Sequence, residues 1–334
     1  MPSALFNPSR IFVDRAVERH SLTRRILGKF EGIPVEIIDD PKKLKKPAEM
    51  TWAKKGLLLT RMKADPIKEF GAMTESVGRK YYSLDLISNC HLECTYCILQ
   101  SYLQNNPVIT IFTNVEEVLE RLGKQLNQLP LGSVVGTGKI ADSLALDDIL
   151  EHTKFLVPFF ADRNSTLELK TKSDRIENLL GLDHKGQTVV SWSMNPPEII
   201  EREEYKTASF EERLAAARRV ADEGYPVAFH FDPIILHEGW EENYRRAIEG
   251  IFNAIPEDRI AWMSLGTLRF PARQAQIMKK RFPKNRKIME GLISSNRRYL
   301  HYSDDLREET LSFLEEKMTP YLPREKIYRC MDFD

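Results

Sequence analysis

The sequence predicts an α/β fold, a TIM-like partial (β/α)6 barrel with an N-terminal extension and a basic C-terminal segment. From residue 81 onward, short apolar runs that suit strands alternate with amphipathic runs that suit helices. Repeated βα units of this kind form a parallel sheet with helices outside it. Hydrophobic residues make up 42% of the 334 residues, which is enough for a sizeable core. Sites in such folds lie at the C-terminal ends of strands, and three of the four cysteines follow the first predicted core strand.

The N-terminal extension, residues 1–80, carries few predicted elements. We expect a helix with basic flanks over Val13–Phe30 and short strands at residues 33–38 and 56–60. The lysine-rich stretch at residues 41–47 suits a solvated loop, and a contact to a phosphate backbone is the alternative.

The predicted barrel core spans residues 81–270. Its best-supported helix covers Phe210–Glu223, because Ser209 precedes it and Glu212 follows three residues later, which is a capping box. Another helix, at residues 115–126, has an N-cap candidate just before it, Asn114. The predicted strands are 81–87, 133–136, 166–171, 188–194, 227–232 and 260–265, and the other predicted helices are 144–160, 174–180, 197–203 and 241–252.

The C-terminal segment, residues 271–334, is basic. Seven lysines and arginines fall between residues 273 and 287, and we expect a helix at Leu306–Met318. Further cations alternate with aromatic residues, a pattern that suits contacts to phosphates and bases. A solvated basic hairpin is the alternative. The interleaved residues are Arg297, Arg298, Tyr299 and Tyr302.

Composition excludes several classes of protein. The 49 basic side chains balance 49 acidic ones, so any nucleic-acid-binding surface must be local. No apolar run approaches the ~20 residues needed to cross a bilayer, and the first residues lack the apolar core of a signal peptide. Four cysteines, three of them clustered, do not form a disulfide framework. We therefore expect a cytoplasmic protein with no membrane partner, and a monomer.

The cysteine loop runs from Ser88 to Cys97 and contains Cys90, Cys94 and Cys97, spaced C-x3-C-x2-C. Three thiolates on one short loop can bind three irons of a cubane 4Fe–4S cluster, whereas ordinary ferredoxin clusters take four. One iron is then left without a protein ligand. In the radical S-adenosylmethionine (SAM) superfamily, which this spacing resembles, that iron binds the amino and carboxylate groups of SAM. A zinc site or buried thiols are the alternatives, but zinc sites mostly use two C-x2-C pairs, and Cys330 stands alone.

This spacing, with the aromatic Tyr96 before the last cysteine, resembles the radical SAM superfamily. Later segments follow in the same order as in one of its families, the spore photoproduct lyases, and the resemblance covers most of residues 50–330. It implies the radical SAM type of partial barrel and a 5′-deoxyadenosyl radical released from SAM. It also implies a carbon–carbon lyase that repairs a thymine photoproduct in DNA. The segments are Cys97–Gln100, Gly138–Leu144, Leu169–Lys172, Ser193–Asn195, Arg213–Arg218, and Pro233 with His237–Trp240.

The resemblance also implies roles for individual residues near SAM. Lys172 would reach the SAM carboxylate, because a lysine is a point charge. Ser193 or Asn195 would bind the ribose or the amino acid end, which hydroxyl and amide groups suit. Asp142 and Ser143 would line the same site, cap a helix, or do both. A surface polar position is the alternative for each of these residues.

Two departures from the family concern the path that returns a hydrogen atom. In spore photoproduct lyases a cysteine just before the helix of the Asp142 segment donates hydrogen to the product, and residues 138–142 contain no cysteine. The family also has a tyrosine after the last cluster cysteine, where this sequence has Ile98, so only Tyr96 of the tyrosine pair is retained. Cys330, the one thiol outside the loop, is our hypothesis for a replacement donor.

The family further implies duplex DNA with a pyrimidine lesion as partner, and an external electron donor such as flavodoxin or ferredoxin. A base inside the stack cannot reach the cofactor, so the lesion must be flipped out. Arg297 and Arg298 would contact phosphates, and Tyr299 or Tyr302 would stack on or wedge beside a base. Two other functions stay open. One is radical SAM chemistry on a different nucleic acid or small molecule, and the other is an electron-transfer or structural cluster without SAM cleavage.

Overall fold

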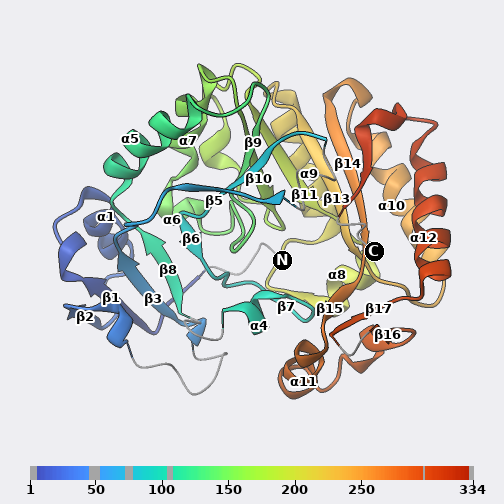
Figure 1. Ribbon diagram of the computed structural model, residues 1–334, viewed down its shortest axis with the longest axis horizontal. Coiled ribbons are helices and arrows are strands. Elements are labelled where there is room, and N and C mark those ends of the chain that lie inside the picture. Colours follow the sequence, from blue (N-terminus) through green and yellow to red (C-terminus); the bar gives the residue numbers. More distant parts are fainter. Residues whose placement is uncertain (1–5, 45–52, 72–77, 104–107, 296–297, 331–334) are drawn as a thin grey trace.

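The computed structural model describes residues 6–44, 53–71, 78–103, 108–295 and 298–330 (Figure 1). An eight-stranded sheet curls through the centre of the molecule in the order β18-β14-β13-β11-β10-β9-β5-β4. Neighbouring strands are parallel except at β4, which pairs antiparallel with β5. The partial parallel barrel predicted from the sequence is thus confirmed. The strands are β4 (Ile67–Glu69), β5 (Tyr81–Leu84), β9 (Val134–Gly136), β10 (Thr166–Thr171), β11 (Thr188–Ser193), β13 (Val227–Ile234), β14 (Ile260–Thr267) and β18 (Ile327–Arg329).

Helices cover the outer face of this sheet (Figure 1). Side chains alternate along each strand, so Leu167 and Leu169 of β10 join the core beneath the helices, while Glu168 points to the inner face. The capping box predicted at Ser209 and Glu212 is confirmed at the start of α9. The outer helices are α5 (Val115–Leu126), α7 (Thr153–Ala161), α9 (Phe210–Asp222), α10 (Trp240–Ala254) and α12 (Asp304–Met318).

The inner face of the barrel is polar at mid-height. Glu168 accepts hydrogen bonds from Tyr81, from Ser191 at 3.1 Å and from His230 at 3.0 Å. Burial alone would raise the pKa of Glu168, but the bond and charge of His230, the charge of Lys170 and the bond from Tyr81 lower it to about 2. The lumen therefore holds a buried, fully paired carboxylate beneath the strand ends.

A second, smaller sheet has the order β2-β1-β3-β8-β6 and its own apolar core. The predicted strand 81–87 is wrong as one element. It divides into β5 of the barrel and β6 of the small sheet, because Ile87 packs against Ile109 and Ile111 in the smaller core. The small sheet thus takes strands from both sides of residue 80, and the domain boundaries at residues 80 and 270 stay predictions. Its strands are β1 (Arg10–Asp14), β2 (Val35–Ile38), β3 (Gly56–Thr60), β6 (Ile87–Ser88) and β8 (Ile109–Phe112).

Three further expectations are corrected. The predicted helix at Val13–Phe30 begins only at Ser21, as α1 (Ser21–Lys29), because Val13 and Asp14 belong to β1 and Arg15–Val17 form a separate 3-10 turn. The predicted helix 144–160 divides into α6 (Asp147–Leu150) and α7, because Glu151 adopts a left-handed φ of 53°. Residues 174–180 contain only a 3-10 turn, Glu177–Leu179.

The C-terminal segment contributes to the barrel and to a small sheet beside it. Its strand β18 pairs with β14, so the predicted strand 260–265 is not the last of the barrel. Beside the barrel, α11 (Ala272–Arg281) accompanies a three-stranded sheet of β15 (Arg269–Pro271), β17 (Tyr299–His301) and β16 (Ile293–Ser295) (Figure 1). No helix among the residues described is both long and apolar enough to cross a bilayer.

Candidate active site

The cysteine loop follows β6 and leads into the short helix α4 (Leu99–Tyr102). Within it, β7 (Glu93–Cys94) pairs antiparallel with β12 (Glu204–Tyr205), and this register sets Cys94 opposite Glu204. β12 comes directly after α8 (Pro197–Glu203), which follows barrel strand β11. The strand pair therefore fixes the loop against the C-terminal end of the barrel.

The three thiols are neighbours in a largely buried loop. Burial raises the pKa of Cys90 to about 12 and that of Cys94 well above its usual value, and nearby negative charges, including the other thiolates, add to both rises. Among the described residues, no three His, Cys, Asp or Glu side chains gather tightly enough to hold a single metal ion. A cubane cluster does not require the thiolates to share one metal ion, because each thiolate binds its own iron.

Hydrogen bonds from three directions hold the loop backbone. The Gln100 amide donates to the carbonyls of Cys94 at 3.2 Å and Thr95 at 2.8 Å. The Gln274 amide, from α11, donates to the carbonyl of Cys97 at 2.6 Å. The Thr95 amide donates to the Glu203 carbonyl at 2.8 Å, and the Thr95 hydroxyl adds a bond to the Glu203 carboxylate at 2.6 Å. The thiols thus sit on a fixed backbone rather than on an open loop.

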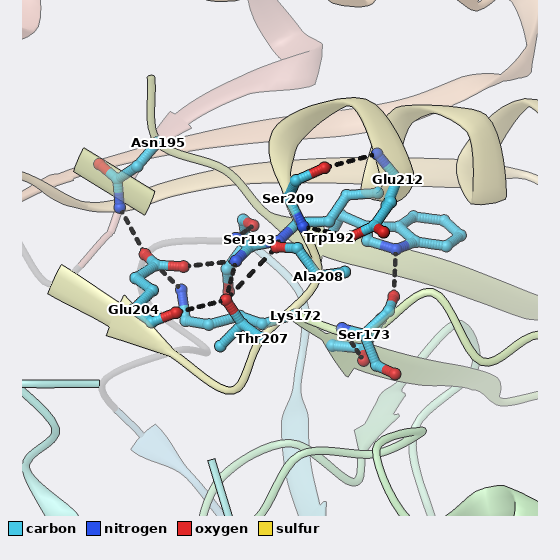
Figure 2. A network of polar contacts seen from close by, with 12 residues as sticks. Lys172, Ser173, Trp192, Ser193, Asn195, Glu204, Thr207, Ala208, Ser209 and Glu212 are labelled. Atoms are coloured by element: carbon cyan, nitrogen blue, oxygen red, sulfur yellow. Dashed lines mark hydrogen bonds and ion pairs between the residues drawn. The ribbon is translucent and has the colours of Figure 1, made fainter. Parts of the chain in front are cut away.

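A buried carboxylate, Glu204, lies at the centre of the polar network beside this loop (Figure 2). Its Oε1 atom accepts from Lys172 Nζ at 3.2 Å, from Asn195 Nδ2 at 2.9 Å and from the Tyr96 hydroxyl. Its Oε2 atom accepts from the Arg213 guanidinium at 2.6 Å. One carboxylate therefore joins the cysteine loop to the ends of strands β10 and β11 and to helix α9.

Charge and burial explain why this network is stable. Burial alone would raise the pKa of Glu204, but the charges of Lys172 and Arg213, with hydrogen bonds from Tyr96 and Asn195, lower it to about 2. Arg213 is fully buried and also donates to the Ser193 carbonyl at 2.8 Å. Removing one member of a buried pair leaves an uncompensated charge, which typically costs about 3–5 kcal/mol.

Asp142 supports Lys172 through the backbone. Its carboxylate accepts from the Lys172 amide at 2.7 Å, from the Thr171 hydroxyl at 2.7 Å, and from the amides of Leu144 and Ala145. Because no helix begins at this point, Asp142 caps a turn instead of the expected helix. Through these four bonds Asp142 joins the backbone at Lys172 to the turn at Leu144 and Ala145.

The other residues predicted to bind SAM lie at the same strand ends. Ser193 ends β11 and is 5% exposed, and Ser143 accepts from the Thr137 hydroxyl at 2.6 Å. Asn195 is 1% exposed, and its carbonyl accepts from the Tyr244 hydroxyl at 2.7 Å while its amide donates to Glu204. The structure thus brings the predicted residues together around Lys172.

Cys330 lies just after β18, at the C-terminal end of the parallel barrel strands. Its backbone amide donates to the Leu265 carbonyl at 2.7 Å, and its buried thiol is hydrogen-bonded to Asp232 at the end of β13. Burial raises the pKa of the Cys330 thiol well above its usual value, and the Asp232 carboxylate adds to the rise. At neutral pH the sulfur therefore keeps its hydrogen.

The predicted DNA-contacting residues do not share one surface. Arg298 is exposed and Tyr299 is 50% exposed, at the start of β17. Tyr302 is only 1% exposed, and its hydroxyl accepts from the Leu236 amide at 2.9 Å, so stacking on a base does not fit its place in the core. Arg297 lies outside the described residues.

Sequence reasoning missed Glu204 and gave Arg213 no role. A lone glutamate after a helix is indistinguishable from a surface residue until β12 pairs with the cysteine loop. In the sequence, Arg213 is only one residue of a helical segment. Its position could have indicated a buried charge, because it shares a helix face with the small and apolar residues Ala216, Ala217 and Val220.

Comparisons with known proteins agree on one family. A family model described as spore photoproduct lyase matches residues 6–329. The spore photoproduct lyase of Bacillus subtilis (strain 168) is 28% identical over 259 residues, which are 74% of this chain and 75% of that protein. The spore photoproduct lyase of Clostridium acetobutylicum is 22% identical over 314 residues, 90% of this chain and 92% of that protein.

Solved structures give the same fold. A variant of spore photoproduct lyase superposes with a TM-score of 0.85 at 23% identity, covering 98% of this chain and 99% of the other. A doubly substituted variant, solved with bound AdoMet and dinucleoside spore photoproduct, has a TM-score of 0.84 at 22% identity, with the same coverage.

We predict that Glu204→Gln lowers the thermal unfolding midpoint because Arg213 loses its buried counter-charge. A carboxylate with a folded-state pKa of about 2, below its ordinary 4.5, stabilises fully above pH 4.5 and loses this effect as the pH falls towards 2. The gap between wild type and Glu204→Gln should therefore narrow over that range, measured by calorimetry. Glu201→Gln, on the exposed side of α8, is the matched control and should change little. A gap that stays constant between pH 4.5 and 2 would contradict the assignment.

Proposed function

The chain belongs to the spore photoproduct lyase family, and from that premise we propose that it is a radical SAM enzyme that repairs a thymine photoproduct in DNA. One observation carries the proposal. The three thiols of the cysteine loop lie against a buried network that holds Lys172 and the ends of two barrel strands in place.

Cys90, Cys94 and Cys97 would hold a 4Fe–4S cluster with one iron left open. When bound, the cluster and SAM would supply a 5′-deoxyadenosyl radical, given an electron from an external donor such as flavodoxin or ferredoxin. The protein's contribution is a fixed loop backbone and thiols of which Cys94 is buried and Cys90 and Cys97 are half-buried, which limits contact with water.

Lys172 is the residue that we expect to bind the SAM carboxylate. Its side chain is 15% exposed, and Glu204 uses one of its three donors, so others can reach a ligand. Ser193 and Ser143 would offer hydroxyls at the strand ends. Asp142 and Asn195 would act as positioning residues, because their polar atoms already bond to this chain.

Tyr96 would be the retained member of the family's tyrosine pair. Its hydroxyl donates to Glu204, and Lys172 Nζ lies 5.7 Å from the centre of its ring. The hydroxyl is therefore tied to the residues that would bind SAM. Ile98, 44% exposed, has no group that could relay hydrogen.

Cys330 would be the hydrogen donor to the substrate carbon radical. The S–H bond would break and a C–H bond form, leaving a thiyl radical on Cys330 until an external thiol reductant returns a hydrogen atom. A protonated thiol is the form that this step needs, and burial of Cys330 keeps it protonated. Its contact with Asp232 holds it at the C-terminal edge of the barrel, where the strand ends meet.

DNA would contact the exposed end of the β16–β17 hairpin. Arg298 would bind a phosphate, and Tyr299, half exposed, would stack on or wedge beside a base. Arg297, adjacent in sequence, would add a second phosphate contact. Tyr302 is not part of this surface and would instead pack the hairpin onto the barrel.

We predict that anaerobically reconstituted protein, given dithionite, SAM and DNA carrying the spore photoproduct, forms 5′-deoxyadenosine and restores thymine. Chromatography of both products is the measurement, and Cys90→Ala, which removes one iron ligand, should form neither. Cluster binding without any deoxyadenosine would indicate an electron-transfer or structural role. Deoxyadenosine that does not respond to the lesion would indicate a different substrate.

We predict that Cys330→Ala and the isosteric Cys330→Ser restore less thymine per deoxyadenosine formed, because neither replacement gives up a hydrogen atom as readily as a thiol. The total deoxyadenosine and the thermal midpoint serve as controls for SAM cleavage and folding. Unchanged thymine yield and product distribution in both variants would remove Cys330 from the mechanism.

We predict that lesion-containing duplex binds less tightly as salt increases, and that Arg298→Ala weakens binding and lessens this dependence by the loss of one phosphate contact. Tyr299→Ala should lower affinity with little effect on the salt dependence. Fluorescence anisotropy over a range of salt concentrations measures both effects. Lys124→Ala, a change to a 70% exposed lysine on α5, is the control. Affinity that is flat across ionic strength would count against this interface.

A further inference from the structure

A second buried carboxylate, Glu93, belongs to the cysteine loop. It forms ion pairs with basic side chains from three distant parts of the chain. Arg281, at the end of α11, contacts it at 2.6 Å, and Lys54, just before β3, contacts it at 3.5 Å. Lys206, after β12, lies 3.8 Å away but is 46% exposed. The loop thus joins the small sheet and the C-terminal segment through charge.

Lys54 is the unusual member of this cluster. Its side chain is 3% exposed, although it comes from a lysine-rich part of the sequence. Its ammonium group donates to the Leu92 carbonyl at 2.5 Å, and Leu92 stands between Cys90 and Cys94 in the loop. The charge is therefore held against the backbone that carries two of the three thiols.

The buried charges in this cluster do not balance. Arg281 and Lys54 bring two cations, and Glu93 supplies one carboxylate, whose short contact goes to Arg281. A buried charge is costly unless an opposite charge or good hydrogen bonds compensate it. One excess positive charge of this cluster therefore lies against the backbone between Cys90 and Cys94, and three thiolates that hold an iron–sulfur cluster give an assembly of net negative charge.

We propose that Lys54 is the counter-charge of the iron–sulfur cluster and raises its reduction potential. This inference rests on the proposed function, because it requires the cluster. A nearby positive charge stabilises the reduced, more negative state of a cluster, and net charge is one of the factors that set such potentials. Lys54 is thus a positioning residue that acts through the cluster and does not touch substrate.

The test is a potentiometric titration of the reconstituted cluster, followed by electron paramagnetic resonance. Lys54→Met removes the charge from a buried position and should shift the midpoint potential to more negative values. Lys54→Arg keeps the charge and should stay near wild type. Lys55→Met removes the same charge from the next residue, which is exposed, and should leave the potential unchanged because solvent screens it.

Glu93→Gln should shift the midpoint potential in the opposite direction. It also tests the inference if Lys54→Met does not retain its cluster. Loss of the carboxylate leaves the cations less compensated, so the potential should become less negative. Equal potentials in wild type, Lys54→Met and Glu93→Gln would overturn the inference, and so would equal shifts in Lys54→Met and Lys55→Met. Failure of the wild-type protein to bind any cluster would instead overturn the proposed function, so the two failures are distinguishable.

Discussion

The candidate site depends on one buried ion pair, Glu204 with Arg213. Both side chains are fully buried, and their contact of 2.6 Å allows the carboxylate to remain charged inside the protein. Once charged, Glu204 can accept bonds from Tyr96, Lys172 and Asn195, which come from the cysteine loop and from two neighbouring strands. Helix α9 is therefore linked to the cysteine loop through this carboxylate.

The barrel separates apolar and polar packing across its sheet. The outer face joins strands to helices through aliphatic side chains, and the inner face carries Glu168, His230 and their hydroxyl partners. Gly136 of β9 shows how tightly this interior is filled, because a Cβ atom there would lie 1.9 Å from the Tyr81 hydroxyl. A polar, close-packed lower lumen leaves the strand ends, where Lys172 and Cys330 lie, as the place for chemistry.

Local sequence patterns predicted the bounds of individual helices and strands best. Strand 166–171 and helices 115–126 and 197–203 match β10, α5 and α8 to the residue, because their periodicity lies within each segment. Asn114 does precede α5, but its side chain bonds to Met62 and Glu117 and makes no cap bond to the helix backbone. Which sheet a strand joins depends on distant partners, so the division between β5 and β6 was not predictable. The same reason hides Glu204 and Lys54, since a glutamate or lysine that pairs across the fold resembles a solvated one in the sequence. Motif order predicted Lys172, Ser193 and the three cysteines as site residues, because the chemistry of a site constrains residue types directly, and the structure places them at neighbouring positions beside the strand ends.

The interleaving of the two sheets has a consequence for how the molecule opens. The chain enters the small sheet through β1 to β3, passes into the barrel at β4 and β5, and returns through β6 and β8 before β9, so no single cut separates the two cores. The cysteine loop lies in the return, between two strands that pair with each other. Both ends of the loop are therefore tied to the small sheet, so unfolding of that sheet releases the loop as well, and opening of this kind is governed by the cooperativity of the unit involved. Retention of whatever the thiols bind thus depends in part on the stability of the smaller core, and amide hydrogen exchange of β6 and β8 would report how often that sheet opens.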